Sequence, residues 1–206
     1  MEEFAKFSRR SLVKRAVLSV GIPALSMFRG SPALAQIKRP EVTAMNDQNA
    51  FTVAPDKDRR DHPIVLRGND SLLNKVSASD TEGRATLYEQ VVSPGTGPVL
   101  HLHHNQNEWW YVLDGEFLFQ LGEKKVRVEP HTSVFGPRGV PHAFRCVGKT
   151  AGKMLLVFDP AGQIEEFFVA LAKIGINAGA GEHNEKDLLQ RFGMEYVGPP
   201  LSGDPV

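Results

Sequence analysis

The chain has 206 residues, enough for one domain with extensions, and its 41% hydrophobic and 23% charged residues are typical of a globular protein. Residues 1–35 carry six of the 24 basic and two of the 24 acidic residues, which leaves 18 basic and 22 acidic residues, a net charge of −4. This mildly acidic remainder gives no electrostatic case for binding nucleic acid or an anionic membrane. The one cysteine, Cys146, excludes an internal disulfide.

The first 35 residues are predicted to be an export signal. The run SRRSLVK at residues 8–14 resembles a twin-arginine motif, and a short apolar run at 16–28 and the small-x-small pattern at 33–35 follow it. The apolar run is too short for a stable membrane span. We expect twin-arginine export to the periplasm or outside the cell, with no membrane attachment after cleavage. General secretion and a basic N-terminus without signal function are the alternatives.

The residues after the signal predict a polar arm followed by a β domain. Residues 36–61 are expected to be an arm or linker, with one edge strand at 51–53. From residue 62 to 160, short strands and turns alternate every eight to twelve residues, which is typical of a β-sandwich or barrel. Strands are expected at 64–67, 71–77, 85–93, 99–103, 109–114, 116–121, 124–128, 133–135, 142–147 and 153–159.

The last part of the chain, residues 161–206, is predicted to be a helical extension. Apolar residues recur there at three and four positions, as on one face of a helix: Ile164, Phe167, Phe168, Leu171 and Ile174. Asp159 is a candidate N-cap of this helix and Asn184 of a second one, which Gly193 is expected to end. The helical pair is expected to pack over the barrel, with a lid role as the alternative, and residues 197–201 are expected to be extended.

Four residues in the β domain are candidates for binding a metal ion. His101 and His103 alternate on one predicted strand and therefore point to the same side. Glu108 follows after a bend of four residues, and it can face the same point as the two imidazoles. Two imidazoles and a carboxylate suit a first-row transition metal with open coordination positions. His142 opens a later strand, after a turn rich in glycine and proline, and is a candidate fourth ligand.

The spacing of these residues is similar to that of two cupin motifs. Gly95, His101, His103, Glu108 and Gly115 match the first motif, and Pro137, Gly139 and His142 match the core of the second. The chain resembles a single-domain cupin, most closely the bacterial quercetin-dioxygenase-like proteins. This resemblance implies a mainly β fold, a jelly-roll barrel (double-stranded β-helix) with a C-terminal helical pair. It also implies that His101, His103, Glu108 and His142 are the metal ligands. Two departures, His131 and Cys146, fall at positions that hold no ligand in the family.

The resemblance also implies a cofactor and a chemistry. The cofactor would be one divalent transition metal, and the ligand set suits Fe, Mn, Ni, Co, Cu or Zn. In the resembled enzymes the substrate is a flavonol, and dioxygen cleaves its heterocyclic ring. Glu108 would ligate the metal or accept the proton of the substrate hydroxyl. Phe117, Phe119, Phe144 and Cys146 are candidates for the substrate pocket by strand parity, with ordinary barrel core as the alternative.

The leading hypothesis is a metal-dependent dioxygenase that acts on a flavonol-like or other enolic small molecule. One alternative is another cupin enzyme, an isomerase or decarboxylase, which would need no dioxygen. The other is a non-catalytic module that binds a small ligand or a metal, because one fold hosts many functions. The expected partners are a small-molecule substrate and, for an oxygenase, dioxygen. A homodimer is also compatible with the resemblance, since cupins commonly pair.

Overall fold

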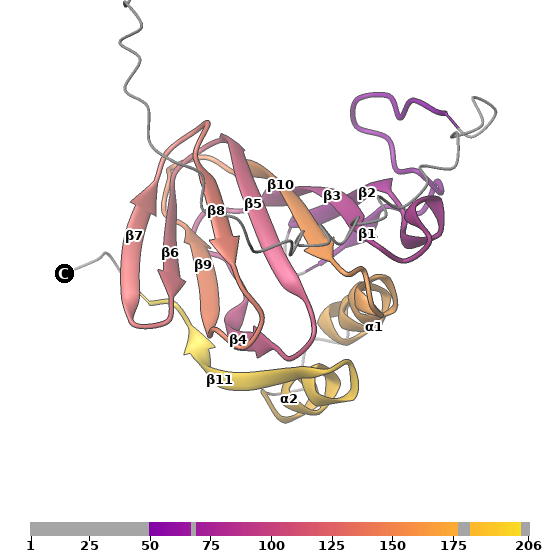
Figure 1. The fold of residues 1–206 in the computed structure, drawn as a ribbon. Coiled ribbons are helices and arrows are strands. Elements are labelled where there is room, and N and C mark those ends of the chain that lie inside the picture. The colour runs from indigo at the N-terminus through magenta and orange to yellow at the C-terminus, as the bar shows by residue number, and fades with distance from the viewer. Residues whose placement is uncertain (1–49, 67–68, 177–181, 203–206) are drawn as a thin grey trace, which may run out of the picture. The chain divides into compact units, whose positions relative to one another are not determined.

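The computed structural model describes residues 50–66, 69–176 and 182–202, in which eleven β-strands and two α-helices form a mainly β fold (Figure 1). The strands make two antiparallel sheets, which confirms the predicted jelly roll. The predicted signal at 1–35 and residues 36–49 of the predicted arm lie outside the described residues. Within the described part of the chain, neither helix has the length and hydropathy needed to cross a membrane.

The first sheet has six strands in the order β1–β2–β3–β10–β5–β8. Their bounds are β1 Ile64–Val65, β2 Ser71–Val76, β3 Thr86–Val92, β10 Gly152–Asp159, β5 Asn107–Asp114 and β8 Ser133–Gly136. Buried and less buried residues alternate along β3 and β10, so one face of this sheet faces the core. In β5 the same alternation buries Trp110 and leaves Trp109 48% exposed.

The second sheet has five strands in the order β11–β4–β9–β6–β7. Their bounds are β11 Met194–Pro200, β4 Val99–His103, β9 His142–Cys146, β6 Phe117–Leu121 and β7 Lys124–Val128. The C-terminal tail, expected only to be extended, is therefore an edge strand of the barrel. It pairs with β4 so that Met194 lies opposite His103 and Tyr196 opposite His101.

The connection between β5 and β6 needs glycine. Gly115 has a φ of +84°, a region that other residues rarely adopt. A Cβ atom at this position would also lie 2.6 Å from the Cα atom of Gly152. The absence of a side chain at Gly115 therefore permits the close approach of Gly152. The turn also connects β5 and β6, as the hairpin signal at residues 114–115 predicts.

Two helices follow the barrel strands, α1 over Ile164–Ile176 and α2 over Glu182–Arg191. α1 buries Ile164, Phe167 and Phe168, as its predicted apolar face requires, and α2 buries Leu188 and Leu189. Both sets of side chains join the main hydrophobic core, so the helical pair packs on the barrel. α2 ends before Gly193, whose φ is +73°, which confirms the predicted stop.

Three local predictions are wrong. Asp159 does not cap α1, because it pairs with Asn107 in the β10–β5 ladder and the helix begins five residues later. Asn184 does not cap α2, because the helix already includes Glu182, a residue type favoured in a first turn. Residues 51–53 form no strand, since β1 occupies the sheet position beside β2.

Candidate metal centre and cavity

The structure brings the four predicted metal ligands together. His101 and His103 lie on β4, Glu108 lies on β5, and His142 opens β9 directly opposite His101. One ligand atom from each residue lies within 4.8 Å of the others, and all four side chains are buried. Neighbouring His104 points outward, where its Nε2 lies 3.9 Å from a carboxylate oxygen of Glu195. Strand alternation thus selects which histidines of this stretch meet.

Each buried imidazole has its Nδ1 atom beside an oxygen acceptor. The Nδ1 of His101 is 2.8 Å from the carbonyl oxygen of Val99, and that of His142 is 2.9 Å from the carbonyl oxygen of Val140. A carbonyl oxygen only accepts, so both Nδ1 atoms carry the proton and donate it. In a neutral ring this places the lone pair on Nε2, the atom that points toward the other ligands.

His101 is held neutral. Burial, followed by the nearby His142 and His103 rings, lowers the pKa of His101 to about 3. A metal ligand must offer a lone pair, and a neutral imidazole offers one. The ring is therefore ready to bind a cation near neutral pH without first losing a proton.

Glu108 is held as a carboxylate. Burial by itself would raise its pKa, but the contacts with His103 and His142 outweigh burial and lower the Glu108 pKa below its ordinary range. Its Oε2 atom lies 3.0 Å from Nε2 of His142 and 3.2 Å from Nε2 of His103. The His142 contact is within hydrogen-bonding distance, so it is attractive when that Nε2 atom carries a proton and repulsive when it presents its lone pair. A cation among these atoms converts the repulsion into attraction.

The environment of the His103 Nε2 atom also fits a role as a metal ligand. This atom is fully buried and has no hydrogen-bond partner, because the nearby Glu108 oxygen does not lie in a hydrogen-bonding direction. A buried polar nitrogen without a partner destabilises the folded protein. Three imidazole nitrogens and one carboxylate form a donor set that fits a divalent transition metal, and they do not by themselves identify which one.

Gln106 positions His103, a role that the sequence analysis missed. Its Oε1 lies 3.2 Å from Nδ1 of His103, while its Nε2 donates to the carbonyl oxygens of Ala161 at 2.6 Å and Pro160 at 3.2 Å. The amide therefore ties the ligand strand to the connection between β10 and α1. A metal-binding histidine needs an acceptor on its other nitrogen, so an amide three residues after His103 was an available signal.

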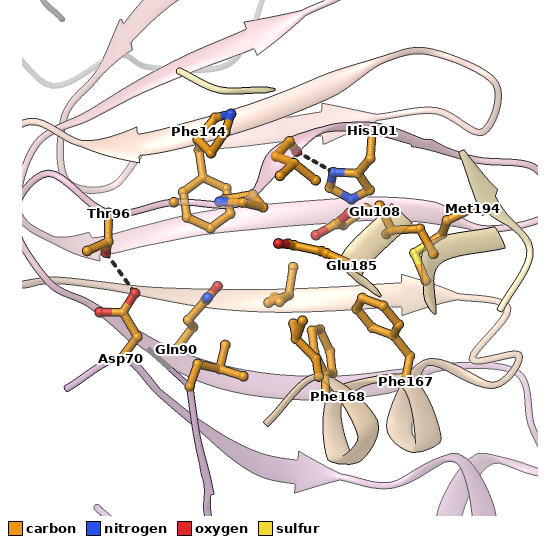
Figure 2. Close-up of a pocket in the computed structure, with 18 of the residues that line it drawn as sticks. Asp70, Gln90, Thr96, His101, Glu108, Phe144, Phe167, Phe168, Glu185 and Met194 are labelled. Atoms are coloured by element: carbon orange, nitrogen blue, oxygen red, sulfur yellow. Dashed lines mark hydrogen bonds between the residues drawn. The ribbon is translucent and has the colours of Figure 1, made fainter. Parts of the chain in front are cut away.

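A cavity of about 370 Å³ opens beside the ligand cluster, between the sheets and the two helices (Figure 2). His101, His103 and Glu108 line it, whereas His142 does not. Most of the remaining lining residues are apolar, and β10, α1, α2 and β11 contribute eight of them: Leu156, Phe158, Ile164, Phe167, Phe168, Leu171, Leu189 and Met194. Glu185 of α2 also lines the cavity. Open coordination positions of a bound metal would therefore face a mostly apolar space of the size typical for small-molecule sites.

The cavity also has a polar end, which we call the distal pole and which consists of Asp70, Gln90 and Thr96. Figure 2 shows these three residues together, away from His101 and Glu108. Gln90 lies on β3, Thr96 lies on the loop after β3, and Asp70 directly precedes β2. The cavity therefore joins a metal-binding wall at one end to neutral and acidic oxygens at the other.

Of the four predicted pocket residues, only Phe144 lines the cavity. Phe117, Phe119 and Cys146 are fully buried in the hydrophobic core instead. Phe119 packs edge-on against Trp110 with ring centroids 5.3 Å apart, and Phe117 against Phe144 at 6.1 Å. These rings fill one end of the barrel, so their inward direction places them in packing contacts and not beside open space.

Comparison with known proteins agrees with this architecture. Residues 88–158, about a third of the chain, match the family model described as a cupin domain. The uncharacterized protein MJ1618 of Methanocaldococcus jannaschii is 29% identical over 77 residues, 37% of this chain and 62% of that protein. Mannose-1-phosphate guanylyltransferase 2 of Escherichia coli O157:H7 is 31% identical over 74 residues, 36% of this chain and 15% of that protein. The chain thus spans less than two thirds of either relative.

Solved structures give the same kind of match. A predicted oxalate decarboxylase from Thermotoga maritima has a TM-score of 0.49 at 20% identity, covering 54% of this chain and 99% of that one. An RmlC-like cupin from Shewanella frigidimarina has a TM-score of 0.48 at 17% identity, covering 56% and 96%. The polyketide cyclase RemF from Streptomyces resistomycificus has a TM-score of 0.43 at 24% identity, covering 52% and 80%. Similarities of this size do not specify a reaction.

Proposed function

We propose that this cupin-domain protein is a metal-dependent dioxygenase that acts on a planar, enolic small molecule of the flavonol type. One observation carries the proposal. Three of the four clustered ligand side chains, His101, His103 and Glu108, form part of the wall of a cavity whose remaining surface is largely apolar. A metal site buried in the core would serve only stability, whereas this one opens onto space for a ligand.

The metal would be held by the Nε2 atoms of His101, His103 and His142 and by the Glu108 carboxylate. When bound, a divalent transition metal supplies Lewis acidity toward an enol oxygen and redox chemistry toward dioxygen. Every other task belongs to the chain. The acceptors on Nδ1 of the three rings fix their orientation, so the four donor atoms keep their positions while ligands enter and leave.

Glu108 is the proton acceptor in this proposal. Its lowered pKa keeps it as a carboxylate near neutral pH, and it faces the cavity. Its Oε2 atom contacts the two imidazoles, which leaves Oε1 to take the proton from the substrate hydroxyl. A cation held by His101, His103, Glu108 and His142 would supply positive charge beside the deprotonated substrate oxygen.

The apolar walls orient the ring system and exclude water. Phe158 packs within 5.6 Å of the His103 ring, and Phe168 packs within 5.7 Å of Phe158, both measured between ring centroids. A planar aromatic ligand can pack against the exposed faces or edges of such a ring cluster. Among the described residues that line the cavity, Arg145 is the cationic one, and it donates to the carbonyl oxygen of Leu201. The lining therefore favours an aromatic ligand over a sugar phosphate.

Oxygen uptake with a matched pair of compounds tests this function. The protein is loaded with each candidate metal in turn and mixed with 3-hydroxyflavone or with flavone, which lacks the enolic hydroxyl. We expect uptake only with the hydroxylated compound and with at least one metal. Glu108→Gln should reduce the rate by roughly two to four orders of magnitude, the range for loss of an acid–base group. Glu129→Gln, an exposed position, is the matched control.

Three outcomes would contradict the proposal. Turnover of an enolic compound without oxygen consumption would indicate an isomerase or decarboxylase. Metal-dependent binding with no reaction under any metal would indicate a binding module. Full activity of Glu108→Gln would remove the proton-acceptor role while leaving the metal requirement in place.

We also propose that residues 1–35 direct folded protein to the periplasm by twin-arginine export, on the basis of the motif at residues 8–14. Replacing Arg9 and Arg10 together by Lys should retain the uncleaved protein in the cytoplasm. The cell fractions are compared by immunoblotting. Unchanged export of the double variant would favour general secretion.

A further inference from the structure

Gln90 is a buried polar residue that the proposed chemistry does not use. It lies on β3, it is 7% exposed, and it lines the cavity. Its Oε1 atom is buried and has no hydrogen-bond partner. An amide oxygen left in this way destabilises the folded protein unless something in the cavity donates to it. The residue is therefore better explained by a bound ligand than by the fold.

The neighbours of Gln90 at the distal pole are firmly held. Asp70 is also 7% exposed, and its two oxygens accept hydrogen bonds from the Ser93 amide at 2.6 Å and from the Thr96 hydroxyl at 2.7 Å. These bonds fix the loop after β3 against the start of β2. The oxygens of Asp70 and Thr96 are therefore held in fixed positions by hydrogen bonds. The Oε1 atom of Gln90 remains able to accept a hydrogen bond.

The register of the sheet gives the distance between the two ends of the cavity. Glu108 pairs with Phe158, and Phe158 with Thr86, so Glu108 is level with Thr86 on β3. Gln90 lies four residues further along that strand, which is roughly 14 Å along the sheet, and two strands away, which is roughly 10 Å across it. The Cα atoms of Glu108 and Gln90 are therefore roughly 17 Å apart, and both side chains point into the core, so a ligand that touches both must be elongated.

We propose that Gln90 determines specificity by hydrogen-bonding a hydroxyl group at the far end of an elongated aromatic ligand. The near end of that ligand carries the enolic oxygen against the wall of His101, His103 and Glu108. A hydroxyl group both donates and accepts, so it matches the Oε1 and Nε2 atoms of one amide. This inference rests on the proposed function, because the enolic end sets the direction in which the ligand lies.

Binding of two flavonols that differ in one group tests the inference. The probes are 3-hydroxyflavone and 3,4′-dihydroxyflavone, whose extra hydroxyl lies at the end opposite the enol. Dissociation constants are measured by fluorescence titration without oxygen, on protein of known metal content. Wild-type protein should bind the dihydroxy probe roughly five- to twentyfold more tightly, the range for one satisfied hydrogen bond.

Substitution of Gln90 should remove this preference. Gln90→Leu should bind both probes with affinities within about twofold of each other, while its affinity for 3-hydroxyflavone stays near the wild-type value. Gln90→Met serves as a second variant of similar size. Gln190→Leu makes the same chemical change at an exposed position of α2 and should keep the full preference. Thermal unfolding establishes that each variant is folded.

The outcomes separate the two proposals. Equal binding of both probes to wild-type protein, or an undiminished preference in Gln90→Leu, would overturn the role of Gln90 while metal-dependent binding still supports the proposed function. Failure of both probes to bind metal-loaded protein would overturn the proposed function and this inference together. If Gln90→Leu and Gln90→Met both fail to fold, Gln90 serves the core and the inference is wrong.

Discussion

The two ends of the barrel interior are built from the same alternating strands, yet one is filled and the other is open. At the filled end, Trp110, Phe117 and Phe119 pack together with Phe144, which also borders the cavity, with ring centroids 5.3 to 6.5 Å apart. At the open end, α1 and α2 form part of the wall, and their side chains enclose a cavity. A helix bordering a curved sheet does not interdigitate with it as closely as a second sheet does.

The candidate metal centre lies on the boundary between these two ends. The His142 ring packs edge-on against Trp110 at 5.3 Å on the filled side, while His101 and His103 line the open side. One ligand is thus anchored by rigid aromatic packing, and the others meet the ligand space. Stability and function are therefore expected to respond to different substitutions.

The largest effect is expected on metal content. His103→Ala removes a ligand from the open side, so metal affinity should fall by more than about a hundredfold, which exceeds the usual loss for an outer residue. The fold should be retained in the metal-free state. Metal is measured by mass spectrometry after dialysis. His104→Ala, at the exposed neighbouring position, should keep normal metal content, and equal losses in both variants would contradict the assigned ligand set.

The next largest effect is a difference in unfolding free energy between substitutions at the two ends. Phe119→Ala, at a fully buried position of the filled end, should cost about 3–5 kcal/mol of unfolding free energy. Phe167→Ala, on the cavity wall, should cost roughly half as much, because part of its surface already borders open space. Urea unfolding of both variants measures the difference. Equal costs would mean that the cavity is not open in solution.

A smaller effect is expected from Gln106, which orients a ligand without being one. Gln106→Leu keeps the volume but removes the acceptor for His103 and the donor to Ala161, so metal affinity should fall by about 10- to 100-fold. Isothermal titration with the native metal measures this loss. A change smaller than twofold would show that the His103 ring is held by packing alone.

The smallest effect is a dependence of stability on pH in the metal-free protein. The folded-state pKa of His101, about 3, lies below its ordinary value of 6.5, so the unfolded chain binds more protons between these values. Stability should therefore fall as pH drops from 6.5 toward 3, by at most about 1.4 kcal/mol per pH unit from this residue. The lowered pKa of Glu108 acts in the same direction below pH 4.5. Chelator-treated protein is unfolded with urea at pH 7.5, 6 and 5, and constant stability would contradict this.

Most of the correct predictions for individual side chains follow from the alternation of residues along a strand. This alternation placed His101 and His103 on one side of β4, and it put Trp109 outside and Trp110 inside. Alternation predicts whether a side chain points into the barrel, but it does not predict the position of that side chain along the barrel axis. Phe117 and Phe119 therefore point inward as predicted but fill the closed end.

The parts that could not be predicted depend on contacts between distant segments. In the sequence, Gln90 looks like an ordinary polar residue of a strand. Its place in a cavity depends on helices that come much later in the chain. The role of Gln106 depends on the backbone of Pro160 and Ala161, more than fifty positions away. β11 contains two prolines, which argue against a central strand, and it is tolerated because it lies at a sheet edge.

The position of β11 has a consequence for how the protein is made. β4, which carries two of the imidazole ligands, pairs along its length with β11 but meets β9 only at His101. A growing chain on the ribosome therefore cannot finish this strand's hydrogen bonding until residues 194–200 have been synthesised. The candidate ligand strand is therefore expected to be complete only after β11 has been synthesised, and premature termination before Met194 would yield a product with β4 on the edge of the sheet.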